Sequence, residues 1–79
     1  MSKQESLMEA ITQDIVGFIM VDDNLELDIA MSLFYNSATF DKLHDIETGL
    51  YLEGSAYIYE LFRDEQLNTN VYAEAQNSP

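Results

Sequence analysis

The aromatic residues of this chain are concentrated in its centre. Seven of the nine phenylalanines and tyrosines lie between Leu33 and Phe62. Large rings bury more apolar surface per residue than other side chains, so they dominate the energetics of cores and interfaces. We therefore expect the chain to pack around this stretch, either within itself or against a partner.

The length of the chain allows one small domain. At 79 residues it is close to the size at which folding buries only about 60% of the unfolded surface. With 47% hydrophobic residues, it is too apolar for a disordered segment. We expect a single helical domain over residues 1–67 and a mobile polar tail over residues 68–79, which are rich in Asn, Gln, Ser and Ala.

Apolar residues recur at helical spacing over the first twenty positions. Ser2 or Ser6 can begin this helix, because each is followed three residues later by a glutamate, as in a capping box. The run Ile15–Val21 also fits a buried strand, but the helix formers before it favour a helix. Gly17 within it indicates a close helix crossing. The expected inner stripe consists of Leu7, Met8, Ile11, Ile15, Val16, Phe18, Ile19 and Met20.

Two further helices are predicted before residue 46. Asp23 is expected to cap a second helix that ends near Tyr35, because acids are favoured at helix N-termini. Ser37 is expected to cap a short third helix that continues to about Asp45. The buried residues of these two helices are expected to be Leu27, Ala30, Met31, Phe34, Phe40 and Leu43.

A last helix follows an apolar connector. Gly49 is expected to stop the third helix, and Leu50–Leu52 to lie against the core, because three exposed large residues in a row are unfavourable. Ser55 is expected to cap a helix that ends near Gln66, with Tyr57, Ile58, Leu61 and Phe62 inside. The predicted fold class is all-α, a compact orthogonal bundle of three to four short helices with a flexible C-terminal tail.

The charge of the chain limits its partners. Fifteen acidic residues against three basic ones give a net charge of −12. Binding to nucleic acids or to anionic membranes requires Lys and Arg to neutralise phosphates, so we expect neither. A protein with a basic surface is the expected partner. A homo-oligomer remains an alternative, because a small domain with little buried surface gains stability from association.

The sequence also bears on the cellular location. There are no cysteines, which excludes disulfides, cysteine-ligated metal sites and cysteine nucleophiles and fits a reducing compartment. The longest uninterrupted apolar run, Ile15–Val21, has seven residues, whereas about 20 are needed to span a bilayer. We expect a cytoplasmic protein.

An acidic cluster follows the first helix. Its oxygen ligands stand at alternating positions, as at the start of a calcium-binding loop. Leu27 occupies the position where such a loop needs glycine, and Leu33 the position where it needs glutamate. We therefore expect no metal here, and interpret the acids as capping residues that also attract a basic partner. The cluster consists of Asp22, Asp23, Glu26 and Asp28.

The chain offers little catalytic chemistry. His44 is the only imidazole, and Asp41 and Asp45 are placed to orient it. It has no second histidine for a metal site and no serine in a nucleophile elbow. Carboxylates for a glycosidase-like pair exist, but so small a domain has too little wall to enclose a sugar. These carboxylates are Glu47, Glu53 and Glu60. We expect no enzymatic activity and no cofactor.

The tyrosines divide into two groups. Tyr51 and Tyr57 are expected in the core. Tyr35 and Tyr59 lie off the inner stripes of their helices, and tyrosine is enriched in the central patches of protein interfaces. The predicted interface therefore combines Tyr35 and Tyr59 with the acidic cluster, namely Asp22, Asp23, Glu26 and Asp28.

Three segments of the central stretch carry a resemblance to known proteins. They are Leu33-Phe34-Tyr35-Asn36-Ser37, Phe40-Asp41-Lys42-Leu43-His44 and Tyr57-Ile58-Tyr59-Glu60-Leu61-Phe62. Over residues 7–65 the chain resembles small uncharacterised helical bacterial domains, some of them encoded beside toxin-like genes, whose closest group has threonine where Asp45 stands. The resemblance implies an all-helical fold and an accessory or partner-neutralising role.

These observations predict a non-enzymatic, acidic protein-protein interaction module, with an accessory or antitoxin-like role. Two alternatives remain at this level. A dense carboxylate surface can imitate the phosphates of a duplex, which predicts an inhibitor of a nucleic-acid-binding protein. A self-assembling structural unit is the other alternative.

Overall fold

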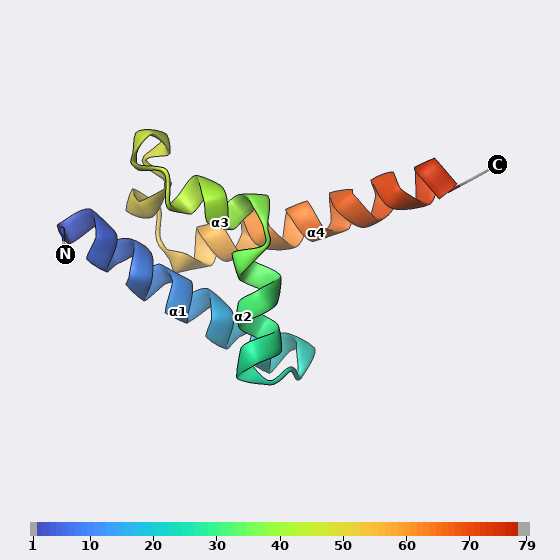
Figure 1. The fold of residues 1–79 in the computed structure, drawn as a ribbon, viewed down its shortest axis with the longest axis horizontal. Coiled ribbons are helices and arrows are strands. Elements are labelled where there is room, and N and C mark those ends of the chain that lie inside the picture. The colour runs from blue at the N-terminus through green and yellow to red at the C-terminus, as the bar shows by residue number, and fades with distance from the viewer. Residues whose placement is uncertain (1, 78–79) are drawn as a thin grey trace.

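The described backbone consists of helices and short helical turns. The computed structural model describes the backbone of residues 2–77 and the side chains of residues 2–68. Its elements are α1 (Lys3–Asp23), α2 (Leu27–Tyr35), α3 (Ala38–Leu43), the 3₁₀ turns η1 (Ile46–Thr48) and η2 (Leu50–Leu52), and α4 (Ser55–Asn77). α1 packs against α2 and α4, and α3 packs against α4. Figure 1 shows that α2 runs across α1 rather than along it. The predicted all-α orthogonal bundle is confirmed, and the described residues contain no strand.

α1 begins and ends with distinct capping residues. The Ser2 hydroxyl oxygen accepts a hydrogen bond from the amide of Glu5 at 3.1 Å, so the first of the two possible capping boxes is used. The helix ends after Asp23, because Asn24 takes the left-handed conformation with φ of 54° and closes the last turn. The prediction that Asp23 caps the second helix is therefore wrong. Glu26 precedes α2 instead and makes no side-chain capping bond.

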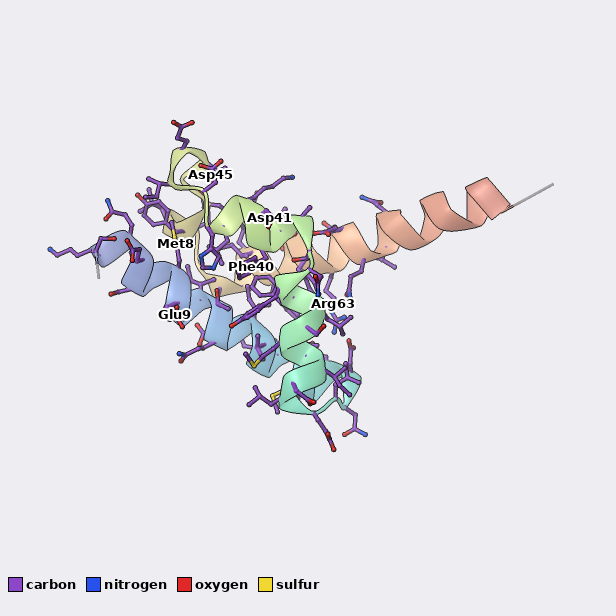
Figure 2. All side chains as sticks on the ribbon, viewed as in Figure 1. Met8, Glu9, Phe40, Asp41, Asp45 and Arg63 are labelled. Atoms are coloured by element: carbon purple, nitrogen blue, oxygen red, sulfur yellow. The ribbon has the colours of Figure 1, made fainter. Side chains whose placement is uncertain are left out.

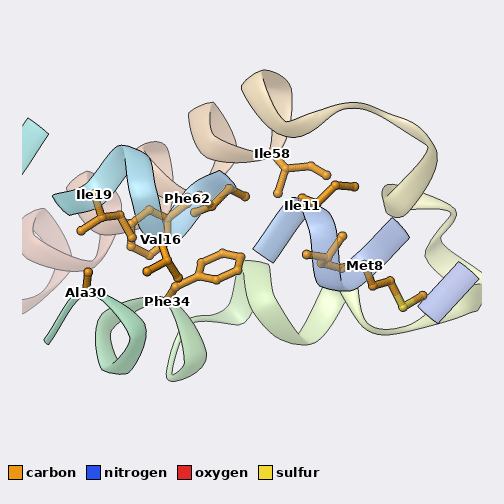
Figure 3. Packing of buried hydrophobic residues seen from close by; sticks show 10 residues of the cluster. Met8, Ile11, Val16, Ile19, Ala30, Phe34, Ile58 and Phe62 are labelled. Atoms are coloured by element: carbon orange, nitrogen blue, oxygen red, sulfur yellow. The ribbon is translucent and has the colours of Figure 1, made fainter. Parts of the chain in front are cut away.

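The core joins α1 to the aromatic centre of the chain. Figure 3 shows Ile58 of α4 beside Ile11 of α1, with the ring of Phe34 entering the same cluster from α2. Phe34 contacts Phe40 and Phe62 edge-to-face, with ring centroids 5.5 Å apart in each pair. The central aromatic stretch thus supplies the anchors of the core, as predicted. The buried apolar residues are Met8, Ile11, Ile15, Val16, Ile19, Ala30, Phe34, Leu43, Ile58 and Phe62.

Several residues predicted inside lie at the surface. The buried stripe of α1 is narrower than predicted, because so small a bundle covers only one side of the helix. The exposed residues with their exposed fractions are Leu7 (45%), Phe18 (38%), Leu27 (55%), Tyr57 (50%) and Leu52 (71%). Leu50 and Tyr51 pack against the core, so the prediction for the connector holds for two of its three residues. At Gly17 an added Cβ would meet no atom within 4 Å, so the predicted close helix crossing is wrong.

The N-terminus of α3 is capped from two sides. The Ser37 hydroxyl oxygen accepts from the Phe40 amide at 3.0 Å, as predicted. The Glu65 carboxylate on α4 accepts from the amides of Ala38 and Thr39, each at 2.8 Å, and from the Thr39 hydroxyl at 2.7 Å. Burial raises the pKa of Glu65, but these hydrogen bonds outweigh burial and lower it overall. α3, only six residues long, is thus fixed to α4.

α4 is longer than predicted. Ser55 is the first residue of the helix and not its cap as predicted, and its hydroxyl donates to Asp14 at 2.7 Å. Its backbone stays helical to Asn77, so the predicted end near Gln66 is wrong. Its C-terminal part projects away from the other helices (Figure 1), which gives the molecule dimensions of 49 × 29 × 17 Å. The predicted mobile polar tail, apart from Asn68, lies outside the described side chains.

Candidate protein interface

A hydrogen-bonded cluster joins the end of α1 to α4. Arg63 donates through Nη1 and Nη2 to the Asp23 carboxylate at 3.0 and 2.7 Å, and through Nε to the Tyr59 hydroxyl at 2.9 Å. Tyr59 in turn donates to Asp22 at 2.6 Å. The guanidinium carbon also lies 5.0 Å from the centroid of the Tyr59 ring. Figure 2 shows Arg63 at this junction, on the side of the molecule away from Met8.

The ionisation of this cluster follows from its contacts. The hydrogen bonds from Arg63 lower the pKa of Asp23 and keep it ionised. Burial raises the pKa of Tyr59, and its bond to Asp22 raises it further, so the phenol stays protonated. Three residues of the predicted interface, Asp22, Asp23 and Tyr59, are thus brought together, but their polar groups are bonded within the chain.

The other predicted interface residues lie on α2 or directly before it. Tyr35 is 43% exposed, and its ring centroid lies 4.9 Å from that of Phe40. Glu26 and Asp28 are exposed at the start of the helix, where their negative charges interact favourably with the positive end of the helix dipole. The structure therefore divides the six predicted residues between two places, the α1–α4 junction and α2.

An apolar groove lies between α1 and α2. Its volume is about 170 Å³, below the roughly 300 Å³ at which pockets begin to hold small molecules. None of the described residues that line it is charged. The sequence did not predict this groove, because residues such as Leu27 that line it were expected in the core but lie at the surface. Its apolar walls come from Leu27, Met31 and Tyr35 on α2 and from Val16, Gly17 and Met20 on α1.

A larger hollow of about 500 Å³ lies between α2 and α4. Arg63 and Glu65 line it, but both side chains are bonded to other groups of the chain. A third hollow of about 330 Å³ borders α3 and α4 and includes Lys42. The α1–α2 groove is therefore the more suitable place for apolar contact with a partner.

His44 has a structural environment. It ends α3, and its ring centroid lies 4.2 Å from that of Phe40. Its Nε2 atom lies 3.2 Å from the Thr12 hydroxyl, which donates its one proton to the Met8 carbonyl at 2.7 Å. Nε2 therefore carries a hydrogen and donates to Thr12. This atom is committed to joining α3 to α1.

The acidic residues are almost all outside ion pairs. All but Glu74 of the fifteen lie among residues 2–68, where Asp23–Arg63 is the one ion pair. The same residues include eleven large apolar side chains that are exposed. Apart from those named above they are Val21, Ile29, Leu33, Ile46 and Leu67. The surface thus combines uncompensated negative charge with apolar area.

The described residues contain no group of three or more His, Asp or Glu side chains arranged to hold a metal ion. Among the same residues, no helix combines the length and apolar character needed to cross a membrane. Over residues 2–77 the fold is all-α with four α-helices, and the chain carries a net charge of −12. No protein family, curated protein or solved structure matches it.

Proposed function

We propose that this protein is a non-enzymatic cytoplasmic interaction module whose acidic surface binds a basic surface on a protein partner. The observation that carries the proposal is that the side chains described over residues 2–68 form one ion pair, Asp23–Arg63, on a chain of net charge −12. Most of the described carboxylates have no cationic partner within the chain, so their charge can attract a cationic protein. Complementary charge raises the association rate and excludes anionic competitors.

Exposed apolar side chains supply the second requirement of such a module. Charge alone gives fast but weak encounters, and lasting complexes need an apolar centre that excludes water. Leu27, Met31 and Tyr35 offer such a centre on α2. The resemblance to small bacterial domains supports an accessory, antitoxin-like role in which binding neutralises the partner.

The test uses a defined probe, a fluorescent amphipathic peptide of about 14 Lys and Leu residues with Leu at helical spacing. The matched control replaces every Lys by Glu. We expect the protein to bind the cationic peptide, with an affinity that falls at least about tenfold between low and physiological salt. The anionic peptide should not bind. Equal binding of both peptides, or no binding of the cationic one, contradicts the proposal.

A further inference from the structure

We propose that the groove between α1 and α2 is the docking site, and that its occupant is an amphipathic helix of the partner with a basic outer face. This inference rests on the proposed function and adds the place and the kind of segment that binds there.

The groove has the form of a helix-binding site. Leu27, Met31 and Tyr35 recur every fourth residue along α2, which places them in one row about 12 Å long. Val16 and Met20 form a matching row on α1. Two facing rows of this length suit about two turns of a third helix, which would insert anchors at i, i+3 or i+4, and i+7. The small volume of the groove admits individual side chains rather than a separate ligand.

Three residues of the groove allow a partner to approach and repack it. Met20 and Met31 have flexible thioether side chains that adapt to different apolar partners. Gly17 lines the groove without a side chain, and an added Cβ there would meet no atom within 4 Å. Packing inside the chain therefore does not require glycine at this position in α1. An open rim gives a helix access to the groove.

The charges around the groove select a basic occupant. Glu26 and Asp28 flank Leu27 in the sequence, and both are exposed. Glu9 lies one helical turn before Gln13, which also lines the groove, and Figure 2 shows Glu9 at the surface of α1. The described basic residues lie elsewhere, since none lines this groove. A second copy of the chain would bring like charges together, so a cationic helix is favoured over self-association.

The decisive experiment compares two substitutions on the same helix. Leu27→Gln removes an apolar side chain from the groove, and Ile29→Gln removes one of similar exposure, 47% against 55%, that does not line it. We expect Leu27→Gln to weaken binding of the Lys and Leu peptide at least about tenfold and Ile29→Gln less than about twofold. A scrambled peptide of the same composition should bind both variants and the wild type equally weakly. Circular dichroism confirms that each variant is folded.

A second comparison separates local charge from net charge. Glu9→Gln with Glu26→Gln, and Glu53→Gln with Glu60→Gln, each remove two charges. Each residue of the first pair lies within one helical turn of a residue that lines the groove, Gln13 or Leu27, whereas Glu53 and Glu60 lie on segments that supply none of the residues lining it. We expect the first double variant to weaken binding several-fold more than the second. Equal losses would mean that the peptide responds only to net charge, which overturns the proposed site.

The outcomes distinguish the two proposals. If the peptide binds but Leu27→Gln and Ile29→Gln have equal effects, the groove is not the site, while the proposed function stands. If the wild type does not bind the peptide at any salt concentration, the proposed function fails and the groove proposal with it. If light scattering shows a dimer that Leu27→Gln dissociates, the occupant is a second copy, and the basic helix is ruled out.

Discussion

Two residues, Gly17 and Glu65, affect stability in different ways, the first through the conformation of its own helix and the second through a contact with another helix. Gly17 lies inside α1, where neither backbone conformation nor packing within the chain requires glycine. Glu65 lies on α4, and its carboxylate completes the N-terminus of a different helix, α3. The first residue lowers the stability of its helix, and the second provides a contact that helix propensity alone does not supply.

Replacing Gly17 by alanine should stabilise the protein. Alanine is favoured over glycine inside a helix by about 0.5–1 kcal/mol, and its Cβ meets open space here. Urea unfolding should show this increase in the free energy of unfolding. Gly49→Ala is the control, because φ of +66° at Gly49 should make alanine destabilising by about 1 kcal/mol. A loss of stability in Gly17→Ala would contradict the open surroundings of this position.

Replacing Glu65 by glutamine should destabilise the protein by about 1 kcal/mol at neutral pH. The substitution removes the charge and one of the two acceptor oxygens that bind the start of α3. Asp64→Asn is the matched control, since Asp64 is the exposed neighbour of Glu65. Equal effects in the two variants would show that the cap contributes nothing beyond charge.

The contribution of Glu65 should also depend on pH. Its pKa is lower in the folded chain than its usual value of 4.5, so the folded state favours the ionised form. The stabilisation is therefore complete above that usual value and is lost as the pH falls through the folded pKa. The stability difference between wild type and Glu65→Gln should shrink over this acidic range. A difference that stays constant from neutral pH into that range would rule out a carboxylate cap.

At the scale of elements, α4 organises the bundle. It contributes Ile58 and Phe62 to the core, caps α3 through Glu65, and holds the end of α1 through Arg63. The Arg63 link bridges forty positions in the chain and joins α1 to α4 where α1 ends. Because both of its side chains are about one-third exposed, at 29% and 33%, solvent screens the ion pair.

A double-mutant cycle should measure this link. Asp23→Asn and Arg63→Gln together should show a coupling free energy of about 0.5–1 kcal/mol in urea unfolding, as expected for a bidentate but partly exposed pair. The same cycle with Lys42→Gln in place of Arg63→Gln should give a coupling near zero, because Lys42 makes no described ion pair. Coupling of equal size in both cycles would mean that only net charge is being measured.

At the scale of the whole molecule, charge opposes folding. A net charge of −12 is confined to a bundle in which the described residues form one ion pair. Repulsion among the carboxylates raises the free energy of the compact state relative to the extended chain. The same excess of negative charge attracts a cationic partner, so this one feature lowers stability and supports the proposed function.

Adding neutral salt should therefore stabilise the protein. Screening shortens the range of repulsion from about 30 Å at 0.01 M to about 8 Å at physiological ionic strength, so Tm should rise by several degrees over this range. NaCl and KCl should act alike, which separates screening from specific ion binding. An unchanged Tm would indicate that the carboxylates are already compensated or too widely spaced to repel one another.

The presence of the helices and their order along the chain were predictable, because helix formation depends on residues that are close in sequence. The stripe through Ile11, Ile15 and Ile19 and the cap at Ser37 identify their helices from local spacing alone. The junction formed by Asp23 and Arg63 was not predictable. Asp23 was assigned to a cap, because its partner lies forty positions away and no local pattern indicates it.

The candidate interface shows the same division. Tyr35 is exposed as predicted, but it stands in one row with Leu27 and Met31, which were expected inside, so local spacing alone did not separate it from them. Bonding of Tyr59 to Asp22 and Arg63 required α1 and α4 to meet. The exposed position of Leu27, and with it the groove, required α2 to cross α1 at one particular rotation.

The sequence by itself determined an acidic, all-helical chain whose central rings form the core, because charge, helical periodicity and apolar content are properties of composition and spacing. Only the tertiary structure decided which side of each helix is covered, which acidic residue forms the ion pair with Arg63 and where an apolar groove remains. These outcomes depend on how few helices are available to cover one another, and a chain of 79 residues leaves apolar residues of α1, α2 and α4 exposed.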